Sequence, residues 1–216
     1  MDKKNLNLGN YTSPAGKASY PKLNSPDTKY KAEGEYSVNL VFSEDSPEAK
    51  ALMDLIDEAH EKNVAYWKEG LNEHELEMFK VHDKPYRAER DRDTKKPTGN
   101  IKFKFGMKAG GTRQDKSTWT QQPDLFDGQA KPLPASVTIT GGSTIKVSYY
   151  INGWKTPQLG AGVSCKLKGV QLIEKAGFNG DAADQGFSAV EGGFSAADTP
   201  ADVDAPAADQ TPGQFA

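Results

Sequence analysis

Apolar and polar side chains alternate most clearly in the stretch from Thr140 to Glu174. Alternate residues of an extended strand point to opposite faces, so this pattern gives the first half one apolar and one polar face. The apolar face consists of Ile145, Val147, Tyr149 and Ile151, and the polar face of Thr144, Lys146, Ser148, Tyr150 and Asn152. The pair Asn152-Gly153 then breaks the run, and a second alternating run extends from Leu159 to Leu167. The pattern predicts two strands around a central turn.

The second run changes phase near its end. Apolar residues occupy odd positions through Leu167 and even positions at Val170 and Leu172. Such a shift requires one extra residue in the strand, so we expect a β-bulge near Lys168-Gly169. The direction of Lys166 is therefore better defined than the direction of Lys168.

Two other segments alternate in the same way, Glu35–Phe42 and Ile101–Lys108. In the second segment the polar face carries three lysines, which are Lys102, Lys104 and Lys108. Lysines in a row repel one another, so they form either a solubilising row or a surface for a partner that neutralises them. Weaker patterns predict an edge strand within Tyr11–Leu23, strands within Trp119–Phe126 and Ser136–Ile139, and a charged loop from Val81 to Asn100.

The hydrophobic period changes after Ser46, where apolar residues begin to recur at steps of three and four. Ser46 suits the N-cap and Pro47 suits the first turn, so the pattern predicts a long helix from Pro47 to about Lys68. A short helical piece is expected over Asn72–Lys80. Because strands and helices do not alternate, a parallel sheet is not expected. The fold class is mainly β, either a small Greek-key barrel of the OB type with one inserted α-helix or a β-sandwich.

Charge is divided unevenly along the 216 residues. The chain has 27 Lys and Arg against 30 Asp and Glu, a formal net charge of −3. Residues 176–216 hold seven of these acids and no base, which leaves a formal +4 on residues 1–175. That acidic segment is rich in Gly, Ala, Asp, Pro and Ser and cannot bury enough apolar surface to offset its chain entropy. We predict a flexible arm over residues 1–10, one domain over 11–175 and a disordered acidic tail over 176–216.

Motifs of known enzymes are incomplete in this sequence. His60-Glu61 and His74-Glu75 begin like zinc-binding helices, but Val64 and Met78 stand where the second histidine is required. Glycine-rich segments lack the lysine of a phosphate-binding loop, and no nucleophile elbow occurs. Cys165 is the single cysteine and falls on an apolar strand face, as a buried thiol would. The sequence indicates a protein that is not an enzyme and uses no metal or other cofactor.

Lysines interleaved with aromatic residues form the remaining chemical signal. Positive charge suits backbone phosphates, and aromatic rings stack on the bases of a single strand. The long helix is acidic on its exposed side, which argues against its entry into the major groove of a duplex. The candidate binding residues are Lys102, Lys104, Lys108, Trp119, Lys146, Tyr150, Trp154, Lys155, Lys166 and Lys168. The pattern favours single-stranded DNA or RNA, and a structural or partner-docking barrel is the alternative.

Three stretches of the body follow one another in a specific order. They are GEYSVNLVF with PEAKALMDLIDEAHEKNVAYW, then IKFKFGMKAGGTRQDKSTW, then GGSTIKVSYYINGWKTPQLGAGVSCKLKGVQLIE. In order and spacing they resemble the single-stranded DNA-binding proteins of podovirus-type bacteriophages, the replication proteins of the gene-two-point-five kind. The resemblance implies an OB fold and sequence-independent binding of single-stranded DNA during replication, recombination and repair. It also assigns the DNA-binding surface to the lysines of IKFKF and SCKLK, to Trp154 and to Tyr149 or Tyr150.

The same resemblance implies partners and a location. The acidic tail of the family contacts the phage DNA polymerase and helicase, which assigns partner binding to Asp202, Asp204, Asp209 and Phe215 of this chain. Here Phe215 is followed by Ala216, whereas the family tail ends in an aromatic residue. A homodimer in solution, a strand-annealing activity and a place in the cytoplasm of the infected bacterial host are also implied. Since no apolar run approaches 18 residues, no membrane association is expected.

Overall fold

The computed structural model describes residues 4–176 together with residues 188, 190 and 191. Residues Met1–Gly177 form one compact unit. The predicted acidic tail falls almost entirely outside the described residues, and so do its four predicted partner-binding residues, Asp202, Asp204, Asp209 and Phe215. The description below therefore concerns the body of the chain.

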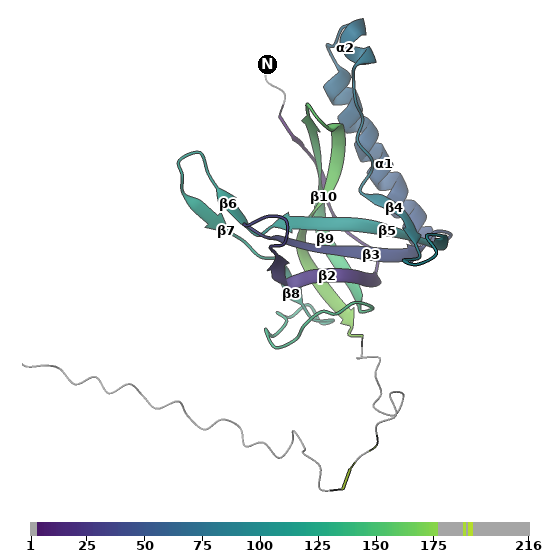
Figure 1. The fold of residues 1–216 in the computed structure, drawn as a ribbon, viewed down its shortest axis with the longest axis vertical. Helices are drawn as coiled ribbons and strands as arrows, with labels where there is room; N and C mark the ends of the chain where they lie inside the picture. The colour runs from purple at the N-terminus through teal and green to yellow at the C-terminus, as the bar shows by residue number, and fades with distance from the viewer. Residues whose placement is uncertain (1–3, 177–187, 189, 192–216) are drawn as a thin grey trace, which may run out of the picture. The chain divides into compact units, whose positions relative to one another are not determined.

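The described body is mainly β, as the alternating pattern predicts (Figure 1). The elements in chain order are β1 (Leu6–Thr12), β2 (Gly16–Asp27), β3 (Glu35–Ser43), α1 (Pro47–Lys68), α2 (Glu73–Glu77), β4 (Tyr86–Arg90), β5 (Pro97–Lys108), β6 (Gly110–Thr112), β7 (Thr118–Thr120), β8 (Asp124–Phe126), β9 (Thr144–Thr156) and β10 (Gly160–Glu174). The long helix therefore begins and ends where the sequence predicts.

Five strands close into a barrel in the order β9-β2-β3-β5-β10, and β10 pairs again with β9. Neighbouring strands are antiparallel except for β5 and β10, which are parallel. Figure 1 shows β2, β3 and β5 side by side, crossing the long β9 and β10. A closed five-stranded Greek-key barrel with an inserted helix is an OB fold, and the β-sandwich alternative is wrong. Three strands extend the barrel: β1 on β9, β4 on β5 and β8 on β10.

The barrel is filled by the apolar faces that alternation predicts. Burying these side chains removes apolar area from water, which is the main stabilising contribution to the fold. The apolar side chains at most 2% exposed within β3, β5, β9 and β10 are Val38, Leu40, Phe103, Phe105, Ile145, Val147, Tyr149, Ile151, Ala161, Leu167 and Val170. The expected bulge is also present, because the register of β10 against β9 shifts between Leu167 and Gly169. The outward set of side chains therefore changes parity there.

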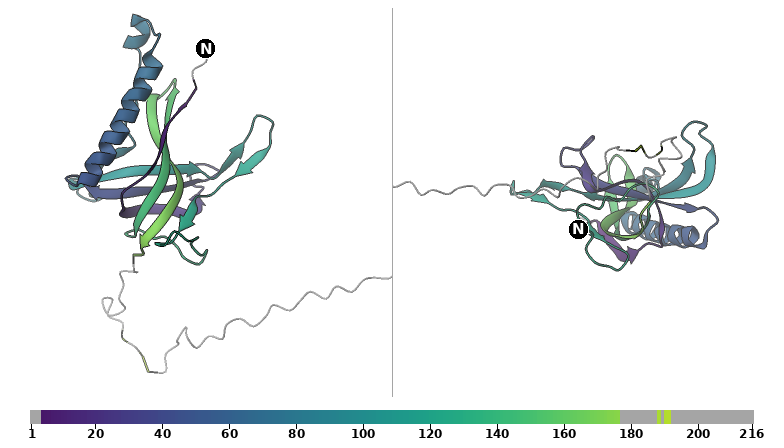
Figure 2. Two further views of the ribbon diagram at one scale, coloured as in Figure 1. Left: turned by 180° about the vertical axis from the view of Figure 1, so that it is seen from behind. Right: turned by 90° about the horizontal axis from the view of Figure 1, so that it is seen from below.

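Helix α1 docks against β9 and β10 through a buried apolar face (Figures 1 and 2). The Ser46 side chain caps its first turn by accepting a hydrogen bond from the backbone N–H of Ala49 at 3.1 Å. Asn63, which is fully buried, donates from Nδ2 to the carbonyl oxygens of Trp154 at 3.2 Å and Gly162 at 2.9 Å. Its Oδ1 accepts a hydrogen bond from Trp67 Nε1 at 3.1 Å. This amide ties the helix to both long strands.

The turn predicted at Asn152-Gly153 is wrong. Strand β9 runs through this pair to Thr156, and the turn follows at residues 157–159. Gly153 lies against α1, and a Cβ at this position would overlap Oδ1 of Asn63. The glycine therefore provides room for a helix side chain instead of a turn.

Five further expectations differ from the structure. Residues 6–12 of the predicted arm form β1, which pairs with β9. The segment expected as an edge strand becomes β2, which pairs with β3 and, at its start, with β9. The predicted charged loop contains β4, whereas residues 136–139 form no strand. The short helix covers only Glu73–Glu77, because a capping box at Asn72 starts it and the chain turns at Met78.

Candidate nucleic-acid interface

The outer face of β3, β5, β10 and β9 is a continuous polar surface. One row across these strands consists of Ser37, Gly106, Lys166 and Tyr150, in which each residue is the register partner of the next. Side chains opposite one another on neighbouring strands lie close together on one face. Lys166 therefore lies between the ring of Tyr150 and a glycine that has no side chain to cover it.

A groove of about 800 Å³ opens on this face. The groove forms where the strand paired with one edge of β5 changes along its length. Strand β4 pairs with β5 from Pro97 to Phe103, and β10 pairs with β5 at Phe105 and Gly106. The diverging chains leave a space between residues 81–87 and β10. The cationic and aromatic residues that line this groove include Lys84, Arg87, Lys102, Lys104, Trp154 and Lys166.

The cations of the groove fall into two groups. Two of them have an acidic partner: Lys102 lies 2.8 Å from Glu89, and Lys84 lies 2.7 Å from Asp57. The other group consists of Arg87, Lys104 and Lys166, which form no ion pair within the described part of the chain. Cations without a counter-ion on the protein are available to an anionic ligand.

Electrostatics at Lys166 reveal the surplus of positive charge. Burial lowers the pKa of this lysine, and the neighbouring Lys108, Lys31 and Lys104 lower it further, while Glu35 acts in the opposite direction. Bringing lysines close together costs free energy unless an anion joins them. Perturbed groups in a cleft often mark a functional site, and here burial is the largest cause of the lowered pKa, with the three nearby lysines adding to it.

Trp154 is held rigidly on the groove wall. Its Nε1 donates a hydrogen bond to Oγ of Ser164 at 2.8 Å, and the His82 ring packs against it with 5.1 Å between ring centroids. His82 is itself fixed, because its backbone N–H donates to the Ala161 carbonyl oxygen at 2.8 Å. A pre-positioned aromatic ring loses little conformational entropy when a flat ligand stacks on it.

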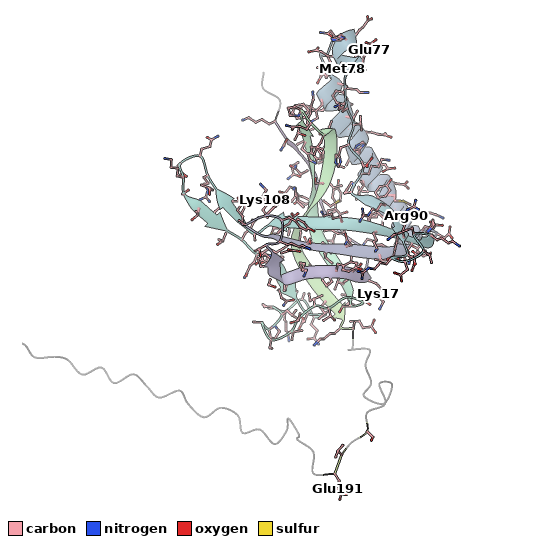
Figure 3. All side chains as sticks on the ribbon, in the orientation of Figure 1. Lys17, Glu77, Met78, Arg90, Lys108 and Glu191 are labelled. Carbon is pink, nitrogen blue, oxygen red and sulfur yellow. The ribbon has the colours of Figure 1, made fainter. Side chains whose placement is uncertain are left out.

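The structure brings several predicted site residues together. Lys102, Lys104, Trp154 and Lys166 line the one groove. Tyr150 stands opposite Lys166 on the neighbouring strand. Figure 3 shows Lys108 at one end of β5 and Arg90 of β4 near the other end. Lys108 contributes to the lowered pKa of Lys166.

Tyr149 does not belong to this surface. Its side chain is 1% exposed and packs against Phe105, with 4.9 Å between ring centroids, and against Tyr11. Of the two adjacent tyrosines, Tyr150 is therefore the one on the outer face. Burial raises the pKa of the Tyr149 phenol, whose oxygen has no hydrogen-bond partner in the described part of the protein.

Like Tyr150 and Lys108, four other predicted residues lie outside the lining of the groove. Lys155 Nζ lies over the Phe79 ring at 5.0 Å from its centroid and over Trp67 at 5.8 Å, near the far end of α1. Lys168 Nζ donates to Asn10 Oδ1 at 3.4 Å, beyond the bulge. Lys146 pairs across from Gln171. Trp119 belongs to the β6–β7 hairpin, which projects from the barrel (Figures 1 and 2).

Arg87 is a groove residue that the sequence interpretation missed. The sequence pattern predicts a loop at this position, whereas β4 places Arg87 opposite Lys102 on the same outer face. The signal was present in the segment YRAER, where Tyr86 packs on Phe103 and the next residue is charged. Such short alternation is too weak to define a strand when it lies between charged turns.

The described residues present neither a metal site nor a membrane-spanning helix. These residues contain no group of three or more His, Cys, Asp or Glu side chains placed to hold a metal ion. Among the helices that the structure describes, none combines the length and the apolar character needed to cross a membrane.

The fold and the groove define the chain as an OB-barrel protein with a cationic, aromatic-walled groove. Residues 15–175 match the model of the family described as single-stranded DNA-binding protein of bacteriophage T7. The chain belongs to this family. This agrees with the prediction made from the order and spacing of three sequence stretches, and with the prediction that the protein is not an enzyme.

Individual relatives support the assignment. The chain is 31% identical over 203 residues to the single-stranded DNA-binding protein of Enterobacteria phage T3, covering 88% of this chain and 86% of that protein. It is 30% identical over 169 residues to the protein of the same name from Escherichia phage T7, covering 76% and 72%. The crystal structure of gp2.5, the T7 single-stranded DNA-binding protein, matches with a TM-score of 0.63 at 27% identity over 87% of this chain and 98% of that one.

The fold is shared more widely. A single-stranded DNA-binding protein from bacteriophage Enc34, solved in complex with single-stranded DNA, matches with a TM-score of 0.54. At 18% identity over 78% of this chain and 88% of that one, this likeness concerns the fold alone.

Proposed function

We propose that this protein binds single-stranded DNA in the groove between residues 81–87 and β10, without sequence preference. The main supporting observation is that Lys104 and Lys166 lie in one groove with the ring of Trp154, which is fixed by its contacts. Neither lysine forms an ion pair in the described body. This arrangement suits a flexible polyanion that also carries flat bases. In its phage, the protein would protect transient single strands during replication, recombination and repair in the host cytoplasm.

Binding divides between phosphates and bases. Phosphates are held by Lys104, Lys166 and Arg87, whose charges displace the condensed counter-ions of the strand. One base stacks on Trp154, a contact worth on the order of 1–3 kcal/mol that any base can make. Since neither contact reads the edge of a base, the binding tolerates all sequences.

Tryptophan fluorescence tests this function directly. Titration with oligo(dT) at low salt should quench the fluorescence, because a stacked base covers the Trp154 ring. Duplex DNA of equal length should quench far less, since its bases are not free to stack. Equal affinity for both forms would contradict a single-strand function, and oligo(U) in place of oligo(dT) measures the preference for DNA over RNA.

The lowered pKa of Lys166 predicts an unusual pH dependence. The free protein loses this charge as the pH rises through a pKa below the ordinary 10.5, whereas a bound phosphate favours the protonated form. Affinity for oligo(dT) should therefore begin to fall at a pH below the titration of ordinary lysines. Lys166→Arg keeps its charge over this range and should flatten the profile. Identical profiles for the two proteins would place Lys166 away from the phosphates.

The acidic segment 176–216 is proposed as a competitor for the groove. Its charge is opposite to that of the body, so deleting it should tighten binding of oligo(dT), most clearly at low salt. Fluorescence titration of the truncated and full-length chains measures the change. Weaker or unchanged binding would mean that the segment does not mask the groove.

The same segment is proposed to bind the phage polymerase and helicase through Asp202, Asp204, Asp209 and Phe215. Homodimerisation and strand annealing are proposed on the family assignment alone. Co-sedimentation of the full-length and truncated chains with each purified partner separates contacts made by this segment from contacts made by the barrel.

A further inference from the structure

Tyr20 is a large aromatic side chain that the fold leaves uncovered. It lies in β2 with 72% of its surface exposed. The register between β2 and β3 shifts between Ser19 and Lys22, and this irregularity turns Tyr20 outward. The fold therefore presents this ring to solvent instead of packing it.

The backbone at Tyr20 is held in an unfavourable conformation. Its φ of 49° lies in the left-handed region, which non-glycine residues rarely adopt. A residue that stabilised the barrel would compensate for such strain by burying its ring, and Tyr20 does not. Strained backbone conformations cluster at binding and active sites, so the conformation of Tyr20 agrees with a binding role.

The ring lies at the margin of the groove. Lys102 Nζ is 5.7 Å from the centroid of the Tyr20 ring, and Lys102 lines the groove. The preceding residue, Ser19, is the register partner of Asn39, which also lines the groove. One side-chain contact and the register of the preceding residue therefore place Tyr20 next to the surface that holds Lys104.

We propose that Tyr20 is a second stacking platform for single-stranded DNA, which extends the groove across β3 to β2. The inference rests on the proposed function of the groove. One base stacks on Trp154, the phosphates pass Lys166 and Lys104, and a further base stacks on Tyr20. The bound strand then crosses the barrel strands from β10 to β2.

Three substitutions at this position test the proposal by fluorescence titration with oligo(dT) long enough to span the groove. Tyr20→Ala should weaken binding about tenfold, as the loss of one stacked base does. Tyr20→Phe keeps the flat ring and should bind like the wild type. Tyr20→Gly should lose as much affinity as Tyr20→Ala, while its thermal midpoint stays equal or rises because glycine accepts a positive φ.

Met78→Ala is the matched control. Met78 is also a large exposed side chain, 68% exposed, but it lies beside α2, away from β2 (Figure 3). Its removal should leave binding unchanged.

In Tyr20→Ala, the quenching of fluorescence at saturating oligo(dT) should persist, because a base still covers the Trp154 ring.

The outcomes separate the inference from the function on which it rests. If the wild type shows no quenching, the proposed function fails. If the wild type is quenched and Tyr20→Ala binds equally well, the second platform is wrong. If Tyr20→Phe loses as much affinity as Tyr20→Ala, the hydroxyl group matters and stacking is wrong.

Discussion

Replacing Lys104 and Lys166 together by alanine should lower the affinity for single-stranded DNA by about 100-fold at low salt. A hydrogen bond to a charged group contributes about 1.5–3 kcal/mol, so losing both phosphate contacts costs about 3 kcal/mol or more. The logarithm of affinity should also depend less on the logarithm of salt concentration. The slope should fall by about 1.4, which is about 0.7 for each lost phosphate contact.

A surface lysine outside the groove provides the control. Lys62 forms an exposed ion pair with Glu58 on α1, 2.6 Å apart, and does not line the groove. Lys62→Ala should change neither affinity nor slope. The thermal midpoint of the double variant should not fall, since neighbouring lysines repel Lys166 in the folded state. A double variant with the wild-type salt slope would show that these lysines do not hold phosphates.

Asn63→Ala should lower the free energy of unfolding by about 3 kcal/mol. The substitution leaves the carbonyl oxygens of Trp154 and Gly162 without their side-chain donor in a buried place. Each unsatisfied buried polar group costs about 1–3 kcal/mol. Urea denaturation followed by circular dichroism measures the loss.

Asn24→Ala is the comparison for this stability prediction. Asn24 also joins separate segments, by donating to the Val137 carbonyl oxygen at 3.0 Å and accepting from the Ile139 N–H at 3.1 Å, but it is exposed. Water can replace its bonds, so the loss should be about 1 kcal/mol or less. Equal losses for both asparagines would show that burial of Asn63 is not what makes it important.

The parts of the fold that sequence predicts are those set by local periodicity. The alternation from Ile145 to Ile151 defines a core face, because a strand has no other way to bury these side chains together. The helix from Pro47 to Lys68 follows from a cap and a period, both of which are local. The bulge before Gly169 follows from a change of phase in the same way.

The parts that sequence misses depend on contacts between distant segments. Gly153 has the local chemistry of a turn, but its neighbour is Asn63, ninety positions away in the chain. Arg87 becomes a groove residue only because β5 provides its partner strand. For the site, lysine and aromatic content predicted the kind of ligand, whereas the division between groove and periphery required the barrel.

The parallel contact between β5 and β10 determines when the site comes into existence. This contact joins Phe105 and Gly106 to Cys165 and Lys166, across some sixty residues of chain. A chain emerges from the ribosome with its N-terminus first, and pairings of distant segments form late in folding. A nascent chain that ends before β10 carries Lys104 but no closed barrel. The complete groove therefore arises only when synthesis of the body is nearly finished, so a growing chain should not capture nucleic acid before β10 has been synthesised.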